Sequence, residues 1–244
     1  MSNKLNVKLR GKGSYGYVYR VIDRNKKFTY AEKHLYVDDT TSKEKKRFIK
    51  EFNIMKKYTH ENLVKAYSID KTNYIYTMEY CDSTLYYYIR ANNNKLKIEQ
   101  IISMAKQFLN GINFLHKNNI LHRDLSFNNV LVKKKDGTVT IKIADFGLAK
   151  DLNDSITCTK TNNNRGTIID PLLENFNKYS IQNEMYSIGY ILYYIFRGRT
   201  KVNLDNEDNS DIKNIIKKCT NINSIKSRYN CVDDLLDDIN NIKY

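Results

Sequence analysis

Residues 122–129 place several reactive side chains in one short polar segment, with the sequence His-Arg-Asp-Leu-Ser-Phe-Asn-Asn. Apolar runs precede and follow this segment, so we expect a loop held on a rigid base of short buried strands. In such a loop Asp124 could accept the proton of a hydroxyl group or orient that hydroxyl, and Asn129 could hold a metal ion through its side-chain carbonyl. A polar surface turn without chemistry is the alternative, and the rest of the chain decides between the two.

A second carboxylate follows this loop at the end of a predicted hairpin. Apolar residues alternate over 139–143 after an Asp-Gly turn, and they predict a strand that pairs with the apolar run at 130–132. The hairpin would carry Asp145, in the sequence Asp-Phe-Gly, close to Asn129. Two oxygen donors on adjacent loops suit the coordination that Mg²⁺ requires.

A glycine-rich segment lies near the start of the sequence. Gly11, Gly13 and Gly16 stand between alternating apolar residues, which predicts a β-hairpin whose turn lets backbone N–H groups approach an anion closely. A dinucleotide-binding fingerprint is excluded because residues 17–22 read as a strand, where that motif needs a helix. A flexible hairpin without a ligand is the alternative.

A lysine and a glutamate follow on two further elements. Residues 28–35 predict a strand in which Ala31 and Lys33 share one face. A capping box at 41–44 then opens a helix, and Glu51 borders its apolar stripe, so that Glu51 could point under the sheet toward Lys33. The alternative is that both charges lie in solvent.

The other elements are expected from the apolar periodicity. Strands are predicted at 63–66 and 73–80, a polar break at 80–83 indicates a linker between two lobes, and 151–166 reads as a long polar loop. Helices are predicted at about 85–89, 99–117, 181–197, 210–219 and 231–242.

The composition limits the class of protein. A chain of 244 residues suits one large domain or two small lobes. No run of about 18 apolar residues occurs, and residues 1–10 lack a secretory apolar segment, so we expect no membrane span and no signal peptide. Four cysteines without paired metal spacing indicate reduced thiols and a cytoplasmic location, or the host-cell cytosol for a viral protein or bacterial effector.

The net charge of +14 would suit nucleic acid, but AT-rich codons explain much of it and no base-stacking motif accompanies it, so nucleic-acid binding is not expected.

The order of these motifs resembles the eukaryotic-type protein kinase family: glycine hairpin, strand lysine, helix glutamate, His-Arg-Asp with a following Asn, and Asp-Phe-Gly. The resemblance extends over about residues 5–240. It implies an α+β, bilobal, protein-kinase-like fold, with a small β-rich N-lobe that contains one main helix and a mainly α-helical C-lobe. Residues 1–244 would then form a single kinase domain with an N-lobe at about 1–78, a hinge at about 79–82 and a C-lobe at about 83–244.

The resemblance also implies roles for individual residues. Asp124 would be the catalytic base, and Lys33 would hold the α- and β-phosphates of ATP while an ion pair to Glu51 fixes it. Asn129 and Asp145 would be ligands of Mg²⁺, with Mn²⁺ as an alternative ion. The residues expected to bind the nucleotide are Leu9, Gly11, Gly13, Gly16, Val18, Ala31, Lys33, Glu51, Met78 as gatekeeper, Glu79 and Cys81 in the hinge, and Leu131.

Three positions depart from the family pattern. Ser126 stands where Ser/Thr-specific members carry a lysine, which removes a cation near the transferred phosphoryl group. The Ala-Pro-Glu motif is represented by residues 172–174, Leu-Leu-Glu, and Arg228 stands where the buried partner of Glu174 is expected. Glu184 replaces the aspartate that supports the His-Arg-Asp loop, adding one methylene to that support.

The predicted function is ATP- and Mg²⁺-dependent transfer of the γ-phosphoryl group to Ser or Thr hydroxyls of protein substrates, the chain itself included. Gly166–Thr167 resembles the Gly-Thr of Ser/Thr kinases, and Arg123 is expected to contact a phosphorylated loop residue, with Thr159 and Thr161 as candidates. The alternatives are a pseudokinase that binds nucleotide as a scaffold, a small-molecule kinase, and a nucleic-acid binder.

Overall fold

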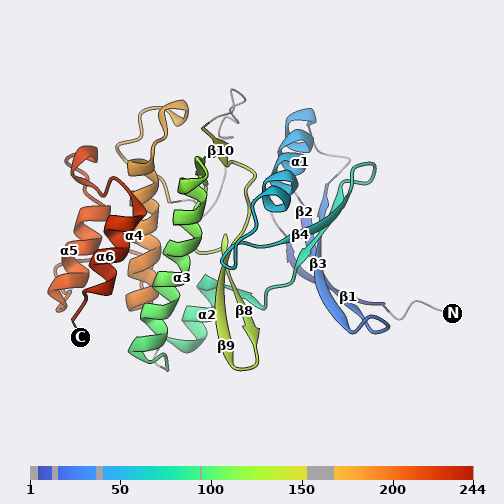
Figure 1. Cartoon of the computed structure of the whole chain (residues 1–244), viewed down its shortest axis with the longest axis horizontal. Coiled ribbons are helices and arrows are strands. Elements are labelled where there is room, and N and C mark those ends of the chain that lie inside the picture. Colours follow the sequence, from blue (N-terminus) through green and yellow to red (C-terminus); the bar gives the residue numbers. More distant parts are fainter. Residues whose placement is uncertain (1–4, 13–15, 37–40, 94, 153–167, 244) are drawn as a thin grey trace.

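The computed structural model describes residues 5–12, 16–36, 41–93, 95–152 and 168–243. Figure 1 shows two parts: a β-sheet with helix α1 on one side of the view and a group of helices on the other, with the β8–β9 hairpin between them. The expected α+β bilobal fold class is confirmed. Gly13, Thr159, Thr161, Gly166 and Thr167 lie outside the described residues.

The N-terminal part is a five-stranded antiparallel sheet in the order β1-β2-β3-β5-β4. At Gly16 a Cβ atom would collide with the backbone carbonyl of His34, so the close pairing of the second and third strands requires glycine there. The strands are β1 (Leu5–Lys12), β2 (Gly16–Asp23), β3 (Phe28–Leu35), β4 (Ala66–Asp70) and β5 (Ile75–Glu79).

Helix α1 (Ser42–Lys57) packs against this sheet through the buried side chains of Phe48, Phe52 and Met55. The predicted capping box is confirmed. The Thr41 hydroxyl accepts the Glu44 N–H at 3.3 Å, and the Glu44 carboxylate accepts the Thr41 N–H at 2.7 Å. The cap fixes where the helix begins and therefore which residues face the sheet.

The C-terminal part is mainly helical, with α4 at its centre (Figure 1). Helix α4 (Ile181–Arg197) is capped at its start by the Ser180 side chain and at its end by Gly198, whose φ of 64° is a left-handed conformation suited to glycine. No helix among the described residues is long and apolar enough to cross a membrane. The helices are α2 (Leu85–Asn92), α3 (Ile98–Lys117), α4 (Ile181–Arg197), α5 (Ser210–Cys219) and α6 (Val232–Asn240), with 3₁₀ turns at Phe176–Lys178 and Ile225–Ser227.

Two small strand groups hold the loops that carry the reactive side chains. One is the sheet β6 (Ser83–Thr84), β8 (Val130–Lys135), β9 (Thr138–Ile143), and the other pairs β7 (Ile120–Leu121) with β10 (Lys150–Asp151). Because β7 pairs with β10 and β8 pairs with β9, the loops 122–129 and 144–149 must emerge side by side. The predicted strand at 63–66 is wrong, since Leu63 makes an isolated bridge to Ile143 and the strand begins at Ala66.

Candidate active site

Lys33 and Glu51 meet beneath the sheet, as their positions in the sequence predicted. The Lys33 ammonium donates to both carboxylate oxygens of Glu51 at 2.8 Å, and the Tyr76 hydroxyl donates to one of them at 2.9 Å. Glu51 is only 4% exposed, so its charge depends on these partners. Burial raises the pKa of Glu51 despite the opposing effect of Lys33. The pair fixes the amine of β3 against α1.

Asp145 faces the same lysine from the lower part of the molecule. Its carboxylate lies 4.0 Å from the Lys33 ammonium and its side chain is 44% exposed. Burial alone would raise the pKa of Asp145, but the charges of Lys33 and His122 lower it below its ordinary value. Burial would lower the pKa of Lys33, and the carboxylates of Asp145 and Glu51 raise it instead. Asp145 is therefore an anion and Lys33 a cation at neutral pH.

The backbone around these groups is held in rare conformations. Asp145 has φ 64° and Arg123 has φ 66°, values that non-glycine residues rarely adopt. His122 hydrogen-bonds the Ala144 carbonyl at 2.9 Å, which ties the two adjacent loops together. Strained residues of this kind persist only where neighbouring contacts over-determine them.

Glu184 provides one of those contacts despite its extra methylene. One of its oxygens accepts the Arg123 N–H at 2.7 Å, and the other lies 2.7 Å from His116 Nε2 on α3. Glu184 is fully buried and the His116 side chain is 6% exposed. The longer side chain thus reaches the loop and is itself held by the imidazole.

Asp124 and Asn129 face one another across the loop. The Asn129 amide donates to the Asp124 carbonyl at 2.7 Å and to an Asp124 carboxylate oxygen at 3.3 Å, so its own carbonyl oxygen is the atom that can face a cation. Ser126 accepts the N–H groups of Asn128 and Asn129 at 3.3 and 3.2 Å. The serine in place of the family lysine therefore supports the turn but supplies no positive charge.

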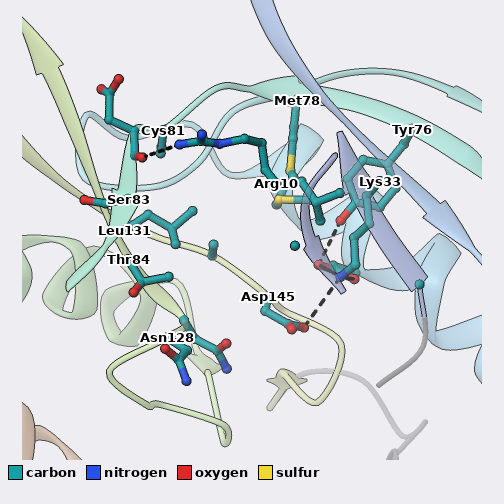
Figure 2. Close-up of a pocket in the computed structure, with 18 of the residues that line it drawn as sticks. Arg10, Lys33, Tyr76, Met78, Cys81, Ser83, Thr84, Asn128, Leu131 and Asp145 are labelled. Carbon is teal, nitrogen blue, oxygen red and sulfur yellow. Dashed lines mark hydrogen bonds and ion pairs between the residues drawn. The ribbon is translucent and has the colours of Figure 1, made fainter. Parts of the chain in front are cut away.

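A cavity of about 470 Å³ opens above these loops, of the size that ligand pockets have. Figure 2 shows Lys33 and Asp145 on one side of it and Leu131 and Cys81 on the other. Burial raises the pKa of Cys81 to about 12, so the thiol stays neutral. The predicted nucleotide residues that line the cavity are Gly11, Gly16, Val18, Lys33, Glu51, Met78, Cys81, Asn129, Leu131 and Asp145.

Four predicted residues are placed elsewhere. Leu9 is 50% exposed and does not line the cavity; by strand alternation it shares a face with Leu5 and Val7, which are 44% and 55% exposed. Ala31 is buried in the core, and Asp124 lies in the loop below without lining the cavity. Glu79 was expected to act through the hinge backbone, and its side chain pairs with Lys133 and Lys142, at 2.6 and 2.9 Å. Gly13 lies outside the described residues.

Sequence reasoning missed several residues of the wall. Arg10 lines the cavity and donates to the Asp82 carbonyl at 3.0 Å, tying the glycine hairpin to the linker between the two parts (Figure 2). Thr84, in β6 and the N-cap of α2, and Tyr87, in the first turn of α2, also line the cavity. The position of Arg10 between Leu9 and Gly11 was a usable signal, whereas nothing in the sequence marked Tyr87.

The donors fit a Mg²⁺–nucleotide complex. Among the described residues no group of three His, Cys, Asp or Glu side chains could hold a metal by itself. Mg²⁺ usually keeps several waters and takes one or two protein ligands together with substrate phosphates. The Asp145 carboxylate and the Asn129 carbonyl supply that number of ligands beside a cavity that is also lined by a cation, Lys33, 4.0 Å from Asp145.

The expected pairing of Glu174 with Arg228 is wrong. Arg228 instead forms two hydrogen bonds with the Asp170 carboxylate, at 2.6 and 2.8 Å, and both side chains are fully buried. The Glu174 side chain is 82% exposed and lies 3.5 Å from Lys178. Asp170 lies a few residues before Glu174 in the sequence. The sequence did not reveal which of these two carboxylates pairs with Arg228.

Arg123 is held by an aromatic side chain. Its guanidinium lies 3.7 Å from the centroid of the Phe176 ring and donates to the Phe176 carbonyl at 2.9 Å. The predicted contact with a phosphorylated loop residue stays a prediction, because the candidate threonines lie outside the described residues.

Comparisons with a family model and with known proteins agree on one family, the protein kinases. The model of the protein kinase domain matches residues 5–242. The chain is 30% identical over 195 residues to the RAF proto-oncogene serine/threonine-protein kinase of Xenopus laevis, covering 77% of this chain and 30% of that protein. It is 32% identical over 154 residues to the tyrosine protein-kinase src-1 of Caenorhabditis elegans, covering 61% and 29%. It is 28% identical to a probable serine/threonine-protein kinase of Clostridium acetobutylicum, covering 100% and 40%. The chain therefore spans less than half the length of each of these relatives.

Proposed function

Because this chain belongs to the protein kinase family, we propose that it transfers the γ-phosphoryl group of ATP to Ser or Thr hydroxyls of protein substrates, with its own chain among the acceptors. The observation that supports this most is the position of the Lys33 ammonium. It lies between Glu51 and Asp145 at the wall of a cavity that Asn129 also lines. The proposed phosphate-binding cation, Lys33, and the proposed metal ligands, Asn129 and Asp145, thus line the same cavity.

The proposed roles follow from this geometry. Lys33 binds the phosphates of ATP, held in place by Glu51, and the hinge at about 79–82 joins two lobes of a single kinase domain. Asn129 and Asp145 hold Mg²⁺, which when bound neutralises charge on the phosphates. Asp124 orients the acceptor hydroxyl and takes its proton, while the amide of Asn129 keeps the Asp124 carboxylate in place.

The choice of Ser/Thr over Tyr acceptors is supported by the Gly166–Thr167 sequence, whereas the curated relatives include both kinds of kinase. We also propose a reducing, cytosol-like compartment, since the three cysteines among the described residues are free.

One observation favours a second candidate, a nucleotide-binding pseudokinase. Ser126 supports the loop turn but supplies no charge where a lysine would stand, and this would slow transfer without preventing binding.

Incubation with γ-labelled ATP, Mg²⁺ and generic protein acceptors tests the proposal. Labelled phosphoserine or phosphothreonine in the wild type, and none in Asp145→Asn, would support it. Phosphotyrosine alone would correct the acceptor. Saturable Mg²⁺–ATP binding without transfer to any acceptor would favour the pseudokinase.

A further inference from the structure

A second open groove lies on the C-terminal part, apart from the nucleotide cavity. It has a volume of about 630 Å³ and is formed by α2, the end of α4 and the segment that follows α4. Arg90, Arg199 and Lys201 contribute positive charge, and Tyr86 and Tyr194 contribute aromatic walls. No Asp or Glu is among the described residues that line it. We refer to these five residues as the basic groove.

The charge of the groove is not explained by pairing within the fold. Arg197 neighbours it, but Arg197 binds both oxygens of Glu207, at 2.8 and 2.5 Å, so these two charges compensate one another. Arg90 lies in the last turn of α2, where its positive charge also interacts favourably with the negative end of the helix dipole. Arg199 and Lys201 follow the Gly198 cap of α4, outside its last turn. Arg199 also helps to lower the pKa of Glu207, although Arg197 is the residue that binds this carboxylate, and the Arg199 and Lys201 side chains are exposed at the groove.

The aromatic walls of the groove contact the loop that carries Asp124. The ring of Phe127, in that loop, lies 4.7 Å from the ring of Tyr194, and its carbonyl accepts the Tyr86 N–H at 3.2 Å. The Tyr194 hydroxyl donates to the Tyr86 carbonyl at 2.8 Å. Tyr87, the next residue of α2, lines the nucleotide cavity. The first turn of α2 therefore separates the two cavities, and a chain with its hydroxyl at Asp124 would reach the basic groove past Phe127.

We propose that the basic groove binds an acidic segment of the substrate protein, carrying Asp, Glu or phosphorylated residues near the acceptor hydroxyl. This inference rests on the proposed kinase function and specifies its substrate class. Charge complementarity identifies the occupant. Nucleic acid fits less well, because the Tyr86 and Tyr194 rings stack on one another, with ring centroids 6.1 Å apart and an angle of 10° between the ring planes. Each ring therefore covers a face of the other on which a base would need to stack.

The test compares two double variants with the same charge change. Arg199→Glu with Lys201→Glu reverses the groove, and Lys71→Glu with Lys226→Glu reverses two exposed lysines elsewhere. Each is assayed on serine peptides that differ only in acidic, phosphorylated or neutral flanks. In the wild type and control, acidic flanks should raise kcat/KM about tenfold through KM. The groove variant should lose that preference while its kcat on the neutral peptide is unchanged.

A binding assay separates this inference from the proposed function. Fluorescence anisotropy of labelled acidic and phosphorylated peptides, without ATP, should show binding to the wild type and control and at least about tenfold weaker binding to the groove variant. That result without phosphoryl transfer would refute the kinase function and leave the groove assignment intact. Transfer with no preference for acidic flanks, or equal peptide binding by both variants, would overturn the assignment. Tighter, groove-dependent binding of a single-stranded RNA oligonucleotide that displaces the acidic peptide would also overturn it.

Discussion

Asp170→Asn tests the buried ion pair of Asp170 with Arg228, in place of which the motif resemblance had predicted a pair of Glu174 with Arg228. The substitution keeps the shape of the side chain and removes its charge, which leaves the Arg228 guanidinium buried opposite a neutral amide. Asp170 also accepts hydrogen bonds from Asn183 at 2.7 Å and from the Leu172 N–H at 3.0 Å, so the site cannot relax easily. Breaking a buried pair of this kind costs about 3–5 kcal/mol.

That cost is a large fraction of the about 5–15 kcal/mol by which domains are stable. For a chain of this size it corresponds to a fall in Tm of roughly 6–20 °C. Urea unfolding at neutral pH, followed by circular dichroism, measures the free energy directly. The matched control is Glu174→Gln, which removes a surface charge and should cost at most about 1 kcal/mol.

The pH dependence gives an independent check on the same pair. Burial raises the pKa of Asp170, but hydrogen bonds from Arg228 and Leu172 lower it more, so the net pKa lies below the ordinary value of 3.8. A carboxylate with a depressed folded-state pKa contributes stability above its unfolded pKa, and that contribution is lost as the pH falls toward the folded value. The difference between wild type and Asp170→Asn should therefore shrink below about pH 4. Equal unfolding free energies for Asp170→Asn and Glu174→Gln at neutral pH would refute the reasoning.

Three further variants address the candidate active site. Asp124→Asn should lower kcat about 10²–10⁴-fold, measured with labelled ATP, while ATP affinity measured by calorimetry is unchanged; loss of ATP binding would contradict the base role. Glu51→Gln should lower kcat/KM for ATP about 10- to 150-fold because Lys33 loses a charged partner, and unchanged steady-state kinetics would contradict that. His116→Ala should destabilise the fold by about 1–3 kcal/mol in urea, since it leaves the buried Glu184 with one partner fewer; a loss no larger than that of Glu174→Gln would show that His116 does not support the loop.

Motifs that lie on regular elements were predictable from the sequence. The pairing of Lys33 with Glu51 followed from strand alternation and from the apolar stripe that Glu51 borders on its helix, because both patterns indicate which face a side chain occupies. The convergence of Asn129 and Asp145 on one cavity followed from a hairpin with an Asp-Gly turn.

Features that depend on a single register or loop offset were not predictable. The pairing of β1 with β2 shifts register between Leu9 and Gly11, and no residue type marks that shift. The resemblance to the family motif assigned Glu174 to Arg228, and a matching position does not show which of two nearby carboxylates is buried. The wall residues Thr84, the N-cap of α2, and Tyr87, in its first turn, belong to a segment that was expected only as the start of a short helix.

The central claim is that Lys33, Asn129 and Asp145 surround one Mg²⁺–ATP site. Isothermal titration calorimetry of ATP, with and without Mg²⁺, tests it without requiring any acceptor. We expect one ATP per chain, with an affinity that Mg²⁺ increases in the wild type and does not increase in Asp145→Asn. An ATP affinity that is independent of Mg²⁺ in the wild type, or equally Mg²⁺-dependent in Asp145→Asn, would contradict the account.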